Sequence, residues 1–322
     1  MTLNRQYFAK FQSLIALFVL CLVLSCISDK FLTVDNGWNV LRQISVNICI
    51  AVGMTLVVLT SGIDLSVGSV LALCGAITAG LLKNGISIAS NDLYIGFTLL
   101  GAILVGLCTG AGMGAFNGMV ITRFKVPPFV ATLAMLTIAR GLTLLWTQGY
   151  PISVFGDRFA YIGTGWFIGI PVPVWISAVV IIAAVILTKK TTLGRYIYAI
   201  GGNESAAKLS GININKVKIL VYSLAGVLAA IGGMIVTSRL DSAQPNAGIS
   251  YELDAIAAVV IGGTSLSGGK GSIWGTVLGA VIIGVLNNGL VLLDVSPFWQ
   301  QVVKGSVILL AVIIDKANTK AE

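Results

Sequence analysis

The stretch LVYSLAGVLAAIGGMIV, residues 220–236, contains no charged residue and decides the environment in which this chain folds. A helix of this length rises about 25 Å, close to the ~30 Å thickness of the hydrocarbon core of a bilayer. Towards the N-terminus the polar segment GGNESAAKLSG (201–211) interrupts the apolar sequence, and VVIIAAVILT (179–188) resumes it. The sequence therefore predicts membrane-crossing helices that are separated by polar connections.

The composition extends this interpretation to the whole chain of 322 residues. Hydrophobic residues make up 57% and charged residues 10%, whereas ordinary globular domains carry roughly 25% charged residues. The polar surface is too small to cover a soluble core, so most of the chain has lipid as its solvent. Histidine is absent from the sequence, which excludes His-ligated metals and Ser–His triads. The cysteines (21, 26, 49, 74 and 108) lie in apolar runs without CxxC spacing and are predicted to pack as small hydrophobic side chains.

The N-terminal segment has two interpretations. Its basic lead, apolar stretch and Ser25–Cys26 pair weakly resemble a lipoprotein signal. A cleaved signal would leave a secreted, soluble chain, yet the residues that follow are equally apolar. We therefore expect the segment to be retained as the first span.

Apolar runs of spanning length predict an all-α, polytopic membrane protein that forms a single transmembrane domain over residues 1–322. The expected spans number about ten, some of them short or broken. A run of ten residues rises only about 15 Å, so the run at 254–263 either borrows its neighbours or does not cross fully. The expected spans are 13–28, 41–60, 67–82, 93–121, 129–148, 173–188, 217–238, 254–263, 273–293 and 298–314.

Lysines and arginines orient these spans, because positive residues stay on the cytoplasmic side. With both termini cytoplasmic, the outer side receives Lys30, Arg42, Lys83, Arg158 and Arg239. The basic net charge is then a topology signal, and nucleic acid is not implied. The connection 149–172 is expected to be a periplasmic loop and 189–216 a cytoplasmic coupling loop. The cytoplasmic set is Arg5, Lys10, Arg123, Lys125, Lys189, Lys190, Arg195, Lys208, Lys216, Lys218, Lys270, Lys316 and Lys320.

The segment GGTSLSGGKGS, residues 262–272, is the one stretch that suggests a nucleotide-binding loop. A P-loop requires G-x-x-x-x-G-K-[ST], because the hydroxyl after the lysine ligates magnesium. Here Gly271 follows Lys270, and Thr264 occupies the position of the first glycine. Acids are also not paired within a span. We therefore expect no catalytic residue, no metal site and no cofactor bound by this chain.

Two segments mark places where helices open. Asp64, Leu65 and Ser66 begin the run [DS]-L-S-x-G at 64–68, and Ser265, Leu266 and Ser267 begin it again at 265–269. In a bilayer, irregular backbone persists only where it is buried in protein or lines a water-filled path. Each segment is either a tight turn whose Asp or Ser caps the next helix, or part of the translocation path or its gate.

A second pair of motifs suggests an inverted repeat. The motif N-G…P-F occurs at Asn117-Gly118 with Pro128-Phe129, and again at Asn288-Gly289 with Pro297-Phe298. An offset of five spans reverses the direction through the membrane, as in transporters with inverted repeats. The spacings differ by two residues. Asn117, Asn287 and Asn288 either bond sugar hydroxyls along the path or bridge helices, and Gly106, Gly110, Gly114 and Gly118 form a smooth face for helix packing.

The polar segment 203–211 has the features of a short helix. Asn203 is a good N-cap, Glu204 complements the helix N-terminus, and Gly211 permits a left-handed end. Between them, Ser205, Ala206 and Ala207 place small side chains where another protein can approach closely. The alternative is a solvated helix that merely joins two spans.

These residues resemble the EAA loop of ATP-binding-cassette importer permeases, in which a short helix docks into a groove of the ATPase. The usual pattern E-A-A-x-x-x-G places the glutamate six residues before the glycine, whereas Glu204 lies seven before Gly211, and the later Leu-Pro is absent. The resemblance therefore implies docking more for Ala206 and Ala207 than for Glu204.

Longer blocks make the resemblance more specific. The blocks are AVGMTLVVLTSGIDLSVGS, TTLGRYIYAIGGNESAAKLSGIN, SAQPNAGISYELDAIAAVVIGGTSLSGGKGS and LNNGL. They are similar to the ribose permeases of bacterial high-affinity sugar importers, in the branched-chain-amino-acid/monosaccharide permease family, and several are shared with xylose, galactoside and autoinducer-2 permeases. The resemblance implies a homodimer, a separate ATPase subunit that binds ATP and magnesium, a periplasmic sugar-binding protein, and the bacterial inner (plasma) membrane.

The sequence thus predicts a permease subunit that moves ribose or a related monosaccharide inward with energy from its partner. The rival is an ion-coupled secondary transporter, which requires paired ionisable groups within the membrane. Asp64, Arg140 and Lys304 have no evident partners in the sequence.

Overall fold

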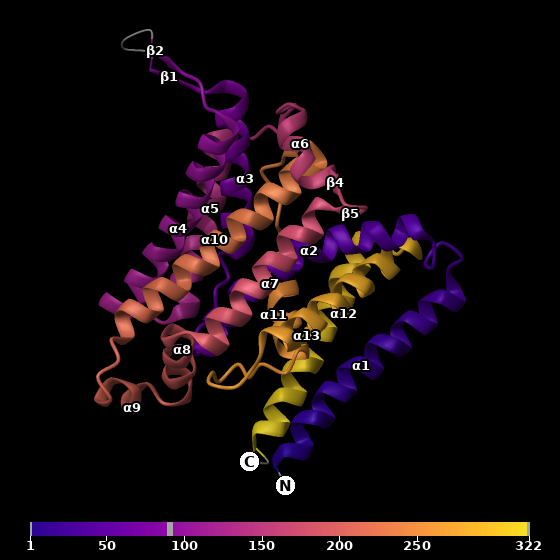
Figure 1. The fold of residues 1–322 in the computed structure, drawn as a ribbon, viewed down its shortest axis with the longest axis vertical. Helices are drawn as coiled ribbons and strands as arrows, with labels where there is room; N and C mark the ends of the chain where they lie inside the picture. The colour runs from indigo at the N-terminus through magenta and orange to yellow at the C-terminus, as the bar shows by residue number, and fades with distance from the viewer. Residues whose placement is uncertain (1, 89–92, 321–322) are drawn as a thin grey trace. The chain divides into compact units, whose positions relative to one another are not determined.

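The computed structural model describes residues 2–88 and 93–320. Within these ranges the chain is helical apart from turns, loops and three short two-stranded sheets. Figure 1 labels the elements in chain order. The helices are α1 (Thr2–Ile27), α2 (Val34–Leu59), α3 (Val67–Asn84), α4 (Leu99–Arg123), α5 (Pro128–Thr147), α6 (Asp157–Thr164), α7 (Val172–Lys190), α8 (Thr192–Gly202), α9 (Glu204–Leu209), α10 (Ile214–Leu240), α11 (Tyr251–Ile261), α12 (Ile273–Leu292) and α13 (Pro297–Lys320). The strands are β1 (Ile86–Ile88), β2 (Leu93–Ile95), β3 (Ile152–Ser153), β4 (Trp166–Phe167), β5 (Ile170–Pro171) and β6 (Ser242–Ala243).

Among the described residues, seven helices are long and apolar enough to cross a membrane, and each corresponds to one expected span. The chain is therefore an all-α, polytopic membrane protein. One boundary differs, because Leu93–Ile95 pairs antiparallel with Ile86–Ile88 instead of opening a helix. Thr98 then accepts a hydrogen bond from the backbone N–H of Gly101 at 3.2 Å and starts α4. The seven helices are α2, α3, α4, α5, α7, α10 and α12.

The three remaining expected spans are helical but do not belong to this set. The apolar part of α1 is limited to Ser13–Ile27. Helix α11 has 11 residues, which rise about 16 Å. Helix α13 covers Pro297–Lys320. Whether these three helices complete ten crossings stays a prediction.

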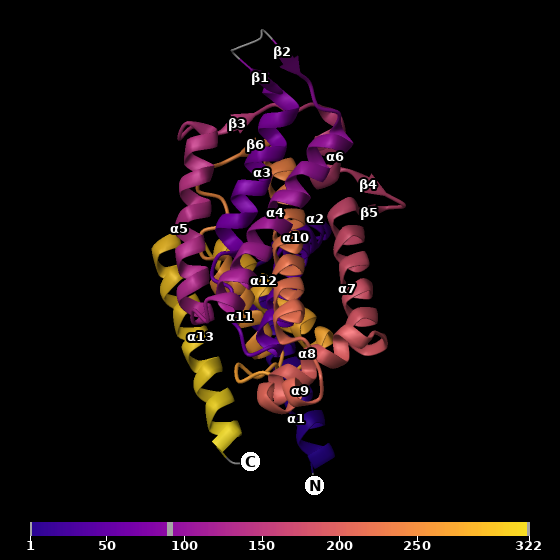
Figure 2. The ribbon, with the colours of Figure 1, turned by 90° about the vertical axis from the view of Figure 1, so that its left-hand side faces the viewer.

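The chain divides into two compact units. The second unit, residues 63–178 and 213–252, is built around α10, which packs against α4 and α3, while α5 packs against α3. Figure 2 shows these four helices running alongside one another. The packing is tight because glycines face each other. A Cβ on Gly110 would overlap the backbone carbonyl of Gly226, and one on Gly114 would overlap that of Tyr222. The predicted packing face on α4 is confirmed.

The first unit, residues 1–62, 179–212 and 253–322, has α12 at its centre, and α2 and α1 pack against it. Thr55 of α2 and Thr276 of α12 share a buried hydrogen bond of 2.6 Å between their hydroxyls. A Cβ on Gly284 would overlap Ile44, and one on Gly279 would overlap the carbonyl of Ala258. Small residues therefore set the close approach of α2 and α11 to α12.

Both long connections contain short elements. Segment 149–172 holds β3, α6, β4 and β5. Ser238 fastens α6 to the end of α10, since its hydroxyl donates to the carbonyl of Phe159 at 2.5 Å and accepts from the N–H of Gly163 at 2.7 Å. Segment 189–216 holds α8 and α9, which turn the chain from α7 into α10.

Candidate coupling segment and buried polar clusters

The predicted helix in segment 203–211 is confirmed as α9 and lies directly after α8. Asn203 ends α8 and also caps α9, because its side-chain oxygen accepts a hydrogen bond from the backbone N–H of Ala206 at 2.9 Å. Gly211 has φ +85° and ends the helix, as glycine does where the backbone is left-handed. The turn is closed by the N–H of Ile212, which donates to the carbonyl of Ala207 at 3.1 Å.

The exposed side of α9 differs from the one expected. Ala207 is only 5% exposed, so its side chain faces the interior of the chain. Leu209 is 91% exposed, which is exceptional for a leucine on a polar segment. Glu204, Ser205 and Ala206 are also exposed. A partner protein would therefore meet Leu209 and Ala206, while Ala207 anchors the helix from within.

In the second unit, the structure brings together three of the predicted path residues. The Asp64 carboxylate accepts hydrogen bonds from the backbone N–H of Ser66 at 2.9 Å and from its hydroxyl at 2.6 Å. The Asn117 amide of α4 donates to the same hydroxyl at 3.0 Å. All three side chains are buried, whereas Leu65 is half-buried. Asp64 thus closes the turn, Ser66 makes no side-chain cap to α3, and a role in the path stays a prediction.

The matching turn in the first unit uses the same device. The hydroxyl of Ser265 accepts from the backbone N–H of Ser267 at 3.3 Å, two residues on, as Asp64 does from Ser66. Leu266 is half-buried and Ser267 is exposed. The shared [DS]-L-S pattern therefore corresponds to a shared local geometry, because a short side-chain oxygen at the first position can satisfy the freed amide.

The asparagines of α12 are engaged in contacts between helices. Asn288 and Asn36 of α2 exchange two amide hydrogen bonds, of 2.8 and 3.1 Å. Asn287 donates to the carboxylate of Asp254 in α11 at 3.1 Å. These contacts, with that of Asn117, support the helix-bridging alternative. The Asn287 side-chain oxygen is buried without a hydrogen-bond partner among the described residues.

Asp254, which accepts the hydrogen bond from Asn287, also forms an ion pair. The ammonium group of Lys304 in α13 lies 3.0 Å from the Asp254 carboxylate, with side-chain exposures of 20% and 4%. The expectation that Lys304 has no partner is wrong. No local signal could have revealed the pair, because fifty residues separate its members and two helices must pack before they meet.

The guanidinium group of Arg140 is also satisfied within the second unit. It donates to the backbone carbonyl of Ala247 at 2.9 Å and to that of Pro245. These partners are backbone carbonyl groups and not ionisable side chains. They lie in the irregular segment before α11, which a sequence pattern does not display.

The two N-G…P-F motifs have parallel local structures. Each Asn-Gly pair lies near the end of a helix, and each proline opens the next one. The intervening connections, 124–127 and 293–296, are equally long. The difference of two residues arises within the helices, because α4 continues to Arg123 and α12 stops at Leu292.

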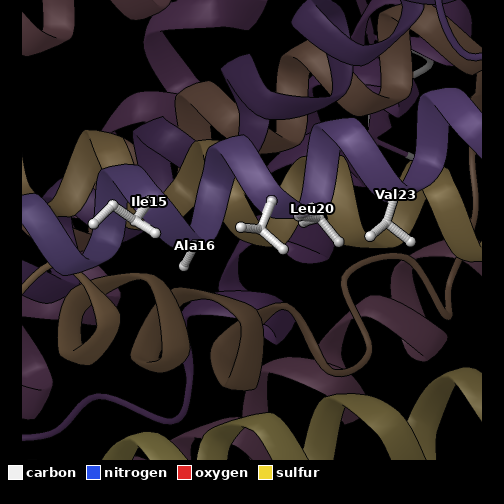
Figure 3. A pocket seen from close by; sticks show the side chains of 5 residues that line it. Ile15, Ala16, Leu20 and Val23 are labelled. Carbon is white, nitrogen blue, oxygen red and sulfur yellow. The ribbon is translucent and has the colours of Figure 1, made fainter.

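Outside these clusters, an apolar hollow runs along α1 (Figure 3). Its lining consists of Ile15, Ala16, Val19, Leu20 and Val23, all from this one helix. Such a surface offers no hydrogen bond to a sugar and is suited to contact with lipid. In the part of the chain that the structure describes, no group of acidic and cysteine side chains is arranged to hold a metal.

Comparison with known proteins identifies the family to which this chain belongs. The family described as "Branched-chain amino acid transport system / permease component" matches residues 37–312, a range that contains α8 and α9, Asp64 with Asn117, and Asp254 with Lys304. The chain belongs to this permease family. It is a multi-pass protein of the bacterial inner (plasma) membrane and a transport subunit, not an enzyme.

Individual relatives of this permease cover nearly its whole length. It is 52% identical to the ribose import permease protein RbsC of Escherichia coli K12 over 97% of both chains. It is 51% identical to RbsC of Bacillus subtilis, over 95% of this chain and 92% of the relative. The xylose transport system permease protein XylH of Haemophilus influenzae is 37% identical, over 95% and 96%. No solved structure matches the chain.

Proposed function

We propose that this chain is the permease subunit of an ATP-binding-cassette importer and moves ribose into the cytoplasm with energy from a separate ATPase. The observation that carries the proposal is the similarity to ribose import permeases at 51–53% identity along nearly the whole chain. Xylose and D-allose permeases are 34–39% identical. This difference favours ribose over the related sugars.

The chain would cross the membrane ten times with both termini in the cytoplasm. In this orientation α8 and α9 would lie on the cytoplasmic side. The positive residues of the same segment, 189–216, favour that side. Two copies of the chain would enclose the path, and a periplasmic binding protein would deliver the sugar. ATP and magnesium would bind to the ATPase.

Helix α9 would be the contact with the ATPase. Leu209 supports this role, because a fully solvated leucine gains nothing in water but contributes strongly when a partner buries it. The small side chain of Ala206 on the same exposed helix permits close approach. Ala207 is buried within the chain, so a bulky residue there would displace α9 itself and would not report docking alone.

An ion-coupled transporter requires paired ionisable groups, and Asp254 and Lys304 form such a pair within the first unit. The charges of this chain therefore do not exclude ion coupling. The family assignment argues against ion coupling instead. We expect a neutral pair of substitutions at these two positions to leave the energy source of transport unchanged.

The test is reconstitution of the permease in vesicles with its ATPase and binding protein. We expect ribose uptake to require ATP and the ATPase subunit. Uptake driven by a proton gradient in vesicles of this chain alone would overturn the proposal.

The docking contact is tested in the same vesicles. Leu209→Asp should weaken ATPase association about 30-fold, the effect of losing a hot-spot residue. The matched control is Leu32→Asp, because Leu32 is 76% exposed and lies in the connection assigned to the outer side. Normal association of the Leu209→Asp permease would show that α9 is not the docking helix.

A further inference from the structure

Helix α9 is attached to a point where three distant segments of the first unit meet. They are the end of α2 (Leu59–Ser61), Gly201 near the end of α8, and residues Ser267–Gly269 of the loop between α11 and α12. We call this meeting point the glycine junction. Its backbones are in direct contact, which permits no side chain between them.

Hydrogen bonds tie the loop to the end of α2. The N–H of Gly269 donates to the carbonyl of Leu59 at 3.1 Å, and the hydroxyl of Ser61 donates to the carbonyl of Ser267 at 2.8 Å. The Ser61 hydroxyl also lies 3.5 Å from the carbonyl of Gly201. One serine therefore contacts both of the other segments.

The end of α8 closes the junction. A Cβ on Gly201 would overlap the carbonyl of Leu59 and the amide nitrogen of Gly269. Gly268 and Gly269 have φ +87° and +70°, in the left-handed region that favours glycine. Only glycine fits at position 201 without moving the neighbouring backbone.

Tyr198 adds a further tie between α8 and the same loop. Its hydroxyl donates to the carbonyl of Gly271 at 2.9 Å. Contacts between backbones cannot adapt by changing rotamers, so a movement of one segment is transmitted to the others. Because Asn203 alone separates α8 from α9, a displacement of α9 reaches the junction directly.

We propose that the glycine junction is the rigid element that carries movement of α9 into α2, α11 and α12. Gly201 and Ser61 are then positioning residues for ATP-driven transport. The proposal rests on the proposed function, in which the ATPase moves α9. It gives the [DS]-L-S-x-G loop before α12, which lacks the P-loop pattern, a structural role: the loop packs against the end of α8.

The chain offers a matched pair of variants for the test. Gly201→Ala forces the three backbones apart, whereas a Cβ on the adjacent Gly202 meets no described atom within 4 Å. Each variant is assembled with the ATPase and the binding protein in vesicles. The measured quantity is the number of ATP molecules hydrolysed per ribose imported, for each assembled complex.

We expect Gly201→Ala to raise this ratio about tenfold, because it disrupts the coupling between two sites and leaves both sites intact. Gly202→Ala should retain the wild-type ratio. If Gly201→Ala does not insert into the membrane, Ser61→Ala decides, since it removes two contacts of the junction and adds no atom. It should raise the ratio about threefold.

A wild-type ratio in Gly201→Ala, or in Ser61→Ala where that variant decides, would overturn the proposal, even if less complex were recovered. Lower recovery with a normal ratio would indicate that the junction serves folding alone. Failure of the proposed function is distinguishable, because the wild-type permease would then show no ATP-dependent ribose uptake with its ATPase.

Discussion

Removing Lys304 should destabilise this permease more than removing any exposed lysine, because it leaves a buried carboxylate without its counter-charge. The Lys304 ammonium group lies 3.0 Å from Asp254, which is 4% exposed and receives a second hydrogen bond from Asn287. The substitution Lys304→Met keeps most of the unbranched side chain and deletes the charge.

The magnitude follows from the geometry. At 3.0 Å the attraction is about 5 kcal/mol with an effective dielectric constant of about 20. Loss of hydration on burial opposes most of this, so the pair contributes little in net terms, but breaking a buried pair costs about 3–5 kcal/mol. Lys304 retains some contact with solvent, so we expect about 3 kcal/mol for Lys304→Met. The double variant Asp254→Asn/Lys304→Met should lie within about 1 kcal/mol of the wild type.

The assay is a double-mutant cycle on unfolding of the detergent-solubilised permease, with ribose uptake as a second measurement. We expect a coupling energy of at least about 2 kcal/mol between the two positions, and more if Asp254→Asn alone is destabilising. Lys30→Met, at an exposed lysine, should stay within about 0.5 kcal/mol. The reasoning is refuted if Lys304→Met costs less than about 1 kcal/mol, or if the double variant is as unstable as the sum of the single variants.

Three further predictions follow from other contacts. On α4, Gly114→Ala should destabilise the second unit by about 1–3 kcal/mol, because its Cβ would overlap the backbone of Tyr222. Gly112→Ala is the control: its Cβ meets no described atom within 4 Å, so it should be neutral or stabilising by up to about 1 kcal/mol. Equal unfolding midpoints for the two variants would contradict this prediction. Asn36→Ala should cost about 1–3 kcal/mol because it leaves the Asn288 amide buried without its partner, and Asn36→Leu/Asn288→Leu should recover part of the loss in the same unfolding assay. Burial raises the pKa of the Tyr198 phenol in the folded protein. Its neutral form therefore stabilises the fold below about pH 10, and this contribution is lost as the pH rises through the raised pKa of the folded state. Tyr198→Phe should lack this alkaline loss of stability, and parallel pH–stability curves for the two proteins would exclude the effect.

Much of the fold could be predicted because spanning helices are local objects. The seven spanning helices lie where uninterrupted apolar runs lie, since a segment in lipid must satisfy its own backbone groups. The error at Leu93–Ile95 has the same origin: an apolar run does not reveal whether it continues a helix or pairs with Ile86–Ile88. The caps of α9 were also predictable, because Asn203 and Gly211 act within one turn of the chain.

The candidate site was predictable only in part. Asp64 and Ser66 were selected as the start of a glycine-containing turn and Asn117 as an amide within a span, and the structure joins the three by hydrogen bonds. Leu209 was not selected, because a leucine in a short helix is indistinguishable from a core residue until burial is known. Ala207 was predicted to lie on the exposed face of α9, because an alanine in a short polar helix is indistinguishable from a surface residue until burial is known.

The sequence by itself determined the membrane environment, most helix boundaries, the turn chemistry and the family, because each depends on composition or on residues within a few positions of one another. Only the tertiary structure decided which polar groups meet. Asp254 and Lys304, Asn36 and Asn288, and the three backbones of the glycine junction lie far apart along the chain. At the glycine junction the contacts exist because glycines let backbones approach closely. All these distances are a property of packing that no local pattern records.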